Sequence, residues 1–110
     1  MPDRRVATGP ARHERPDIDE AALIAARHAD RLLAAAREVG HQRWATYLAP
    51  LPDRLRDDPL DALRPTALRA RAAFGPKDSI RDALPGDLTE PFLLAVDRLV
   101  RLLARRAVEE

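Results

Sequence analysis

Three cations of the chain have the type and spacing to bind an anionic ligand. Arg64 and Arg71 are seven residues apart, so on a helix they share one flank of the apolar face, and Lys77 follows in the stretch "FGPKDSIRDALPG". Free backbone N–H groups at a helix start near Ser79 would bind a phosphate, with Lys77 supplying charge. Phosphate-cradling loops hold several glycines and follow a strand, whereas this stretch follows a helical pattern. We therefore expect a connector between helices, and keep the three cations as candidates for anion binding.

Histidine and carboxylate spacing does not favour a metal site. His13, His28 and His41 lack the i, i+4 spacing that puts two imidazoles on one helix face. Glu38 and His41 form one Glu-x-x-His unit, which carboxylate-bridged di-iron bundles use twice. The chain has no cysteine, which excludes thiolate nucleophiles, disulfides and cysteine-bound zinc. We expect neither a metal nor a cofactor.

Two further groups of residues are candidates for contact with a partner. Trp44 and Tyr47 are three residues apart and fit either the centre of a small core or an exposed anchor; the shortage of other large residues favours the core. A row of arginines lies opposite an apolar stripe near the end of the chain, at Arg98, Arg101 and Arg105. Such a row fits a partner-binding or nucleic-acid strip, or cations that complement a helix dipole.

Small residues on the first predicted helix form a third candidate surface. Ala25, Ala29 and Ala36 keep helical spacing, and alanine permits close approach of another helix while burying little area. The sequence leaves open whether this stripe is the core of one chain or a seam between two chains.

The elements that position these residues are helical. Apolar residues recur every three or four positions in 22–39, 44–55, 60–74 and 92–107, and no segment alternates as a strand does. Asp17 with Glu20, and Asp58 before Pro59, have the spacing of helix N-caps. Pro50 and Pro52 predict a break, Pro65 a kink, and Pro91 a helix start at Thr89, while residues 80–84 predict a short connecting helix.

The fold class that follows is all-α. We predict a small bundle of about four helices with kinks or breaks at prolines, plus one short connecting helix. Residues 1–16 are charged, broken by glycine and proline and without periodicity, which predicts a flexible tail before a single domain of residues 17–110.

Composition narrows the function classes. The 110 residues carry a net charge of +1, so no overall field attracts nucleic acid or anionic lipid. Arginine supplies 18 of the 19 basic residues, which together with the alanine excess is typical of a GC-rich bacterial genome. The start of the chain lacks the apolar core of a secretory signal, and no apolar run is long enough to cross a bilayer. We expect a cytoplasmic protein.

One stretch resembles an enzyme family. Ile18-Asp19, Arg31, Val39-Gly40 and Arg43 look like the first helix of the small all-α chorismate mutases, and 53–57 faintly echoes that family's Asp-x-x-Arg-Glu. When Val39-Gly40 is aligned, Arg31 falls one position out of register, and the last helix offers no inward glutamine or serine. The resemblance covers about forty residues and implies a small all-α enzyme or anion binder.

The favoured hypothesis is a non-catalytic helical interaction or regulatory module that acts through protein–protein contacts or self-association. Enzymatic function is the less favoured alternative. A DNA-binding regulator is a further alternative, although the predicted recognition helix after Ser79 is short and carries a single arginine, Arg81.

Overall fold

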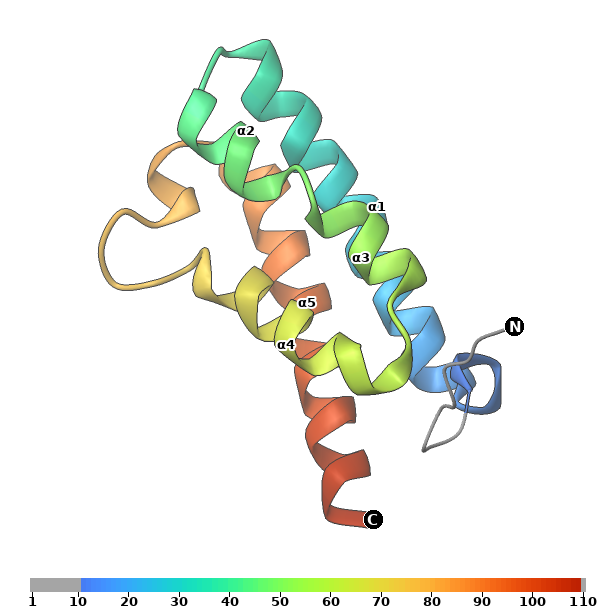
Figure 1. The fold of residues 1–110 in the computed structure, drawn as a ribbon. Helices are drawn as coiled ribbons and strands as arrows, with labels where there is room; N and C mark the ends of the chain where they lie inside the picture. The colour runs from blue at the N-terminus through green and yellow to red at the C-terminus, as the bar shows by residue number, and fades with distance from the viewer. Residues whose placement is uncertain (1–10, 110) are drawn as a thin grey trace.

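The computed structural model describes residues 11–109, and these contain no strand. The helical elements are η1 (Arg12–Glu14), α1 (Pro16–Glu38), α2 (Gln42–Leu48), α3 (Leu51–Asp57), α4 (Leu60–Ala72), η2 (Ile80–Asp82) and α5 (Gly86–Glu109). The predicted all-α bundle is therefore confirmed (Figure 1). Residues 1–10 of the predicted tail lie outside the described residues. Within 11–109, no helix has the length and apolar character needed to cross a membrane.

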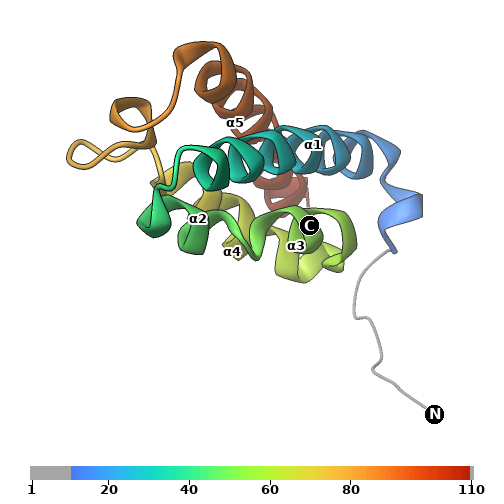
Figure 2. The ribbon, with the colours of Figure 1, turned by 90° about the horizontal axis from the view of Figure 1, so that it is seen from above.

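The long helix α1 lies at the centre of the bundle. Figure 2 shows it running between α5 on one side and α2 and α3 on the other, and it packs against all three. Its predicted alanine-rich stripe is buried, as are Ala26 and Leu33 beside it. Val39 was expected to extend this stripe but is 64% exposed, because the helix has ended and the chain turns at Gly40 with φ of 72°. A positive φ is the conformation glycine adopts most readily at a helix stop.

The prolines divide the middle of the chain as predicted. Pro50 is the N-cap of α3 and Pro52 lies in its first turn, so α2 and α3 are separate short helices. The apolar residues of this segment, Trp44, Leu48, Leu51 and Leu55, are all buried. By contrast, α4 continues through Pro65 as one helix, with its stripe from Leu60 to Phe74 turned inward.

The predicted start of the last helix is wrong by three residues. α5 begins at Gly86, where the carbonyl of Pro85 accepts hydrogen bonds from the N–H groups of Leu88 and Thr89. Thr89 is fully buried, and Pro91 therefore lies inside the helix. Because proline has no N–H, the carbonyl four residues before Pro91 lacks its helical hydrogen-bond donor.

Two predicted N-caps are also wrong. α1 begins at Pro16 with Arg15 as N-cap, and the Asp17 carboxylate accepts from the N–H of the next residue instead of capping the first turn. Pro at the first helical position is already set in a helical φ, which explains the earlier start. Asp58 caps the end of α3, and its carboxylate accepts a 2.6 Å hydrogen bond from the Thr66 hydroxyl.

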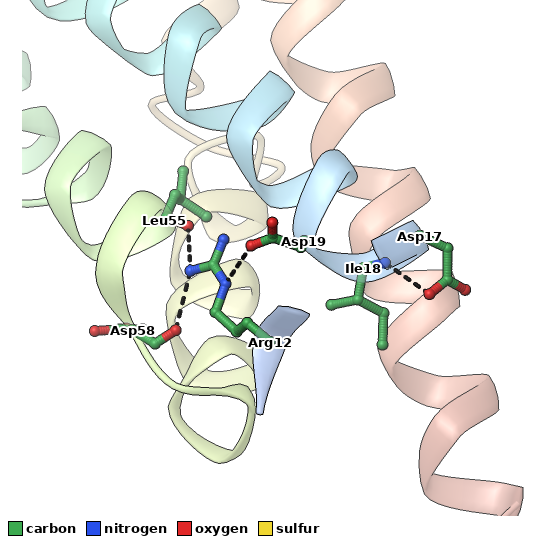
Figure 3. Close-up of polar contacts among 6 residues, drawn as sticks. All are labelled: Arg12, Asp17, Ile18, Asp19, Leu55 and Asp58. Carbon is green, nitrogen blue, oxygen red and sulfur yellow. Dashed lines mark hydrogen bonds and ion pairs between the residues drawn. The ribbon is translucent and has the colours of Figure 1, made fainter. Parts of the chain in front are cut away.

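The segment before α1 is held to the bundle by Arg12 (Figure 3). Its Nε donates to Asp19 Oδ1 at 2.8 Å, and its Nη1 donates to the carbonyls of Leu55 and Asp58 at 2.9 and 3.0 Å. These carbonyls lie at the end of α3, where backbone acceptors lack helical partners. The Arg12 side chain is 12% exposed, so one guanidinium joins η1, α1 and α3 in a largely buried contact, here called the Arg12 clamp.

The connector between α4 and α5 is shorter in helix than predicted. Only Ile80–Asp82 is helical, as a 3-10 turn, whereas the sequence predicted a helix through Leu84. The Ser79 side chain does cap it by accepting from the N–H of Arg81 at 3.2 Å. Ile80 and Leu84 are buried, so both ends of the turn are fixed to the core.

Candidate interaction surface

The outer face of α5 carries a row of exposed charged residues with an exposed leucine among them. Phe92, Val96, Leu99 and Leu103 form the buried stripe of the helix. At 100° per residue, the opposite face is formed by a different set, here called the α5 strip: Asp87, Glu90, Leu94, Arg98, Arg101 and Arg105. All six are exposed, and Leu94 is 70% exposed. Val108 continues this face toward the C-terminus and is 87% exposed.

The arginines of the α5 strip have no hydrogen-bond or ion-pair partner among the side chains of residues 11–108. Elsewhere in the bundle several arginines do: Arg56 bonds Asp30 and Asp53, Arg71 bonds Asp97, and Arg81 bonds Glu90. Asp97 stands four residues before Arg101, at the spacing of a helical ion pair, but its carboxylate is bonded by Arg71 from α4. The Asp97 carboxylate is therefore already bonded and does not pair with Arg101.

Interaction with the helix dipole does not explain why arginines stand at 98, 101 and 105. Favourable interaction of cations with the helix dipole falls off within the last turn, which includes Arg106 but none of Arg98, Arg101 and Arg105. Like charges spaced i, i+3 and i, i+4, as at 98, 101 and 105, destabilise a helix by about 0.2–0.5 kcal/mol per pair. Repulsion within this row of arginines therefore slightly lowers the stability of the isolated chain.

The other end of the same strip is acidic. Asp87 is exposed and makes no ion pair or hydrogen bond within the described part of the chain. Glu90 accepts two hydrogen bonds from Arg81, at 2.7 and 3.1 Å, and this contact lowers the pKa of the Glu90 carboxyl. The strip therefore runs from acidic residues in the first turns of α5, past Leu94, to arginines in its second half.

The candidate anion-binding cations are not brought together into one site. Arg71 donates from Nε to Asp97 Oδ1 at 2.8 Å and so joins α4 to α5. Arg64 is exposed on α4, and Lys77 is exposed in the connector. One of the three cations is therefore neutralised, and the others stand on different segments.

Trp44 and Tyr47 lie on the inner side of α2. Trp44 is 4% exposed, and its ring meets that of Tyr47 edge-on with centroids 5.2 Å apart. The Tyr47 hydroxyl donates to the carbonyl of Arg69 at 2.6 Å, and the Arg69 guanidinium lies over the tyrosine ring. Tyr47 thus joins α2 to Arg69 of α4, and the Arg43 guanidinium lies over the ring of the tryptophan.

The three candidate interface alanines are in the interior of the single chain. Ala25, Ala29 and Ala36 are each 0% exposed. They lie on the face of α1 that packs into the bundle, so contact between copies through them would require the bundle to open.

Two open pockets share His41, which follows the turn after α1. One, of about 390 Å³, lies between α1 and α2 and includes Arg37 and Thr46; the other, of about 330 Å³, lies against the connector and includes Asp78 and Asp82. His41 Nδ1 accepts from the N–H of Trp44 at 3.4 Å, so the ring caps α2. Among residues 11–109 no group of three metal-ligating side chains is close enough to hold an ion.

The residues of the chorismate-mutase resemblance are dispersed. Arg31 is exposed on α1, Asp19 is bonded by Arg12, and Arg43 lies over the Trp44 ring with the centroid 4.9 Å away. These side chains are occupied by packing or by solvent.

Searches of protein-family models, curated proteins and solved structures found no match to this chain.

Sequence reasoning identified the arginines of the α5 strip but missed its acidic end. Asp87, Glu90 and Leu94 lie on the same face as the arginines, and the signal was available: Asp87 and Arg105 are eighteen residues apart, which is five full helical turns. The predicted helix start at Thr89 hid this relation, because Asp87 then lay outside the helix. Arg12 gave no sequence signal, because its partners are up to 46 residues away.

Proposed function

We propose that this chain is a non-catalytic interaction module that binds another protein through the α5 strip. The observation that supports this most is the row of Arg98, Arg101 and Arg105 beside Leu94, exposed and without partners among the side chains that the structure describes. Arginine is enriched at protein interfaces because its planar guanidinium bonds carboxylates in a fixed geometry. The proposal keeps the expected cytoplasmic location, which rests on the sequence.

The chemistry of the strip indicates what its partner must supply. The arginines would be neutralised by anionic groups such as carboxylates, and Leu94 would be stabilised by an apolar contact that removes it from water. A nucleic-acid backbone would meet the first requirement but not the second. The observations therefore favour an acidic protein surface with an apolar centre, and DNA becomes an outcome of the test.

The test compares two variants with the same change in charge. One replaces Arg98, Arg101 and Arg105 with glutamate, and the control replaces Arg27, Arg31 and Arg37, which are exposed on α1. Each is immobilised, exposed to lysate of the native host and washed, and the captured proteins are identified. Binding is then remeasured with the purified partner, a second copy of the chain included.

We expect wild type and the α1 variant to bind the same purified partner within a few-fold, and the α5 variant to bind at least about tenfold more weakly. Circular dichroism should show the same helicity for all three. Equal binding by the two variants would overturn the proposal. Sub-micromolar, sequence-dependent binding to duplex DNA at physiological salt, lost only in the α5 variant, would replace it with DNA recognition.

A further inference from the structure

We infer that the partner of the α5 strip is a second copy of this chain, paired antiparallel through α5 about a twofold axis. This inference rests on the proposed function, since it uses the same surface. It goes further by naming the partner. A second copy is chosen because the acidic and basic ends of the strip face each other when two strips lie antiparallel.

The spacing of the charges sets the register. Asp87 and Arg105 are eighteen residues apart and share one azimuth on the helix, while Glu90 and Arg101 are eleven apart and differ by about 20°. Both pairs have their midpoint close to residue 96. An antiparallel copy centred there sets Asp87 opposite the partner's Arg105, and Glu90 opposite the partner's Arg101. Twofold symmetry makes each contact twice.

The acidic end is able to make these contacts. Asp87 is exposed and unbonded within residues 11–109. Glu90 is held by Arg81, but an ionised carboxylate has about four acceptor positions and can take a second guanidinium. Each arginine that the chain itself leaves unpaired at 101 and 105 therefore gains a carboxylate.

Leu94 lies near the centre of the same register. It is 70% exposed in the single chain and would stand opposite the partner's Arg98, whose aliphatic stem can cover it. The first part of α5 lies at an edge of the bundle in Figure 2, and the residues of the α5 strip are exposed, so a second helix can approach from outside. The last turns of α5 extend past the other helices, which leaves the basic end open to the partner's acidic end (Figure 1).

A parallel pair does not satisfy the same charges. It would place Arg98, Arg101 and Arg105 against the same three arginines of the partner, and Asp87 against the partner's Asp87. Like charges opposed across an interface oppose association. The charge order therefore selects the antiparallel arrangement.

The test is a charge swap read by sedimentation equilibrium at low salt over a micromolar concentration series. Asp87→Arg alone and Arg105→Glu alone each replace two attractive contacts with two repulsive ones. The double variant carries both changes and restores the attraction with reversed sign. Arg27→Glu on α1 is the control for a change in charge elsewhere.

Wild type should exceed the monomer mass at micromolar concentration. Each single variant should raise the dissociation constant on the order of tenfold, and the double variant should return to within about threefold of wild type. Because exposed ion pairs are screened, the dimer should weaken as salt is raised. Circular dichroism should show unchanged helicity in every variant.

A wild-type chain that stays monomeric at hundreds of micromolar would overturn the inference. So would a dimer that neither single variant weakens, or one that the double variant fails to restore. If the chain is monomeric yet a purified heterologous protein binds wild type and not the α5 triple variant, the proposed function stands and only the second copy is excluded.

Discussion

Arg12 and the arginines of the α5 strip belong to one residue type in opposite surroundings. The Arg12 guanidinium is 12% exposed and donates three hydrogen bonds, two of them to carbonyls at the end of α3. Arg98, Arg101 and Arg105 are exposed, lie on one face of α5 and bond no side chain of residues 11–108. The charge of the Arg12 clamp is bonded within the chain, whereas the charges of the α5 strip are exposed to contact by a partner.

Residue type alone therefore does not distinguish an arginine that stabilises the fold from one that is available to bind a partner. What separates them is whether the fold brings acceptors within reach. In the clamp, three elements converge on one side chain; on the strip, the carboxylate of Asp97, four residues before Arg101, is held by Arg71. Three substitutions of arginine test this contrast, and a fourth, at His28, tests an effect of pH; each predicts a different change in the free energy of unfolding.

The largest effect is expected at the clamp. Arg12→Ala should lower the free energy of unfolding by about 2–3 kcal/mol, because it removes hydrogen bonds made by a charged donor and leaves buried carbonyls without a partner. Urea denaturation followed by circular dichroism measures this change. Arg64→Ala, at an exposed arginine on α4, is the control and should change stability little. Equal effects of the two substitutions would contradict the clamp.

A smaller effect is expected at the contact between α4 and α5. Arg71→Ala should lower the free energy of unfolding by about 0.5–1 kcal/mol, since the Arg71–Asp97 pair is partly exposed and screened by solvent. High salt should reduce the difference from wild type. A loss as large as that of Arg12→Ala would show that this pair is structural in the same sense as the clamp.

On the strip the sign should reverse. Arg101→Ala removes a side chain that stands at i, i+3 and i, i+4 from two like charges, so the monomer should gain a few tenths of a kcal/mol. The measurement is made at low protein concentration, where association does not contribute. A clear loss of stability would mean that Arg101 has a structural partner.

The smallest effect concerns pH. Partial burial first, and then the charges of Arg31 and Arg27, lower the pKa of His28 below 6.5. The folded chain therefore binds this proton less tightly than the unfolded chain does. Stability from this source is intact above about pH 6.5 and falls as pH drops below it, toward the lowered folded pKa. His28→Gln should reduce the fall between pH 7 and 5; identical pH profiles would contradict the shift.

Much of the fold follows from the sequence. The 3-4 spacing of apolar residues predicted which faces of α1, α4 and α5 are buried, because burial depends on periodicity, which one sequence displays directly. Pro50 and Pro52 predicted the break between α2 and α3 because a proline removes a backbone donor wherever it occurs.

The helix ends and the partners of polar side chains were harder to predict. Asp17 and Asp58 are of a residue type common at N-caps, but the actual N-caps are Arg15, two residues before Asp17, and Pro59, one residue after Asp58. Thr89 was predicted to start the last helix, yet it lies inside α5 and is buried by tertiary packing, which local spacing does not reveal. The acidic end of the α5 strip was missed for the same reason, since its membership depends on where the helix begins.

Antiparallel association through α5 fixes the distance between matching residues of two copies, and this distance can be measured. The chain has no cysteine, so Leu94→Cys and Val108→Cys each provide one site for a nitroxide label, read by pulsed electron paramagnetic resonance. With a rise of 1.5 Å per residue and a centre at residue 96, labels at 94 should be offset along the axis by only about 6 Å and labels at 108 by about 36 Å. We therefore expect a short distance at 94 and a long one at 108. Short distances at both sites, or no dipolar coupling at any concentration, would contradict antiparallel association through α5.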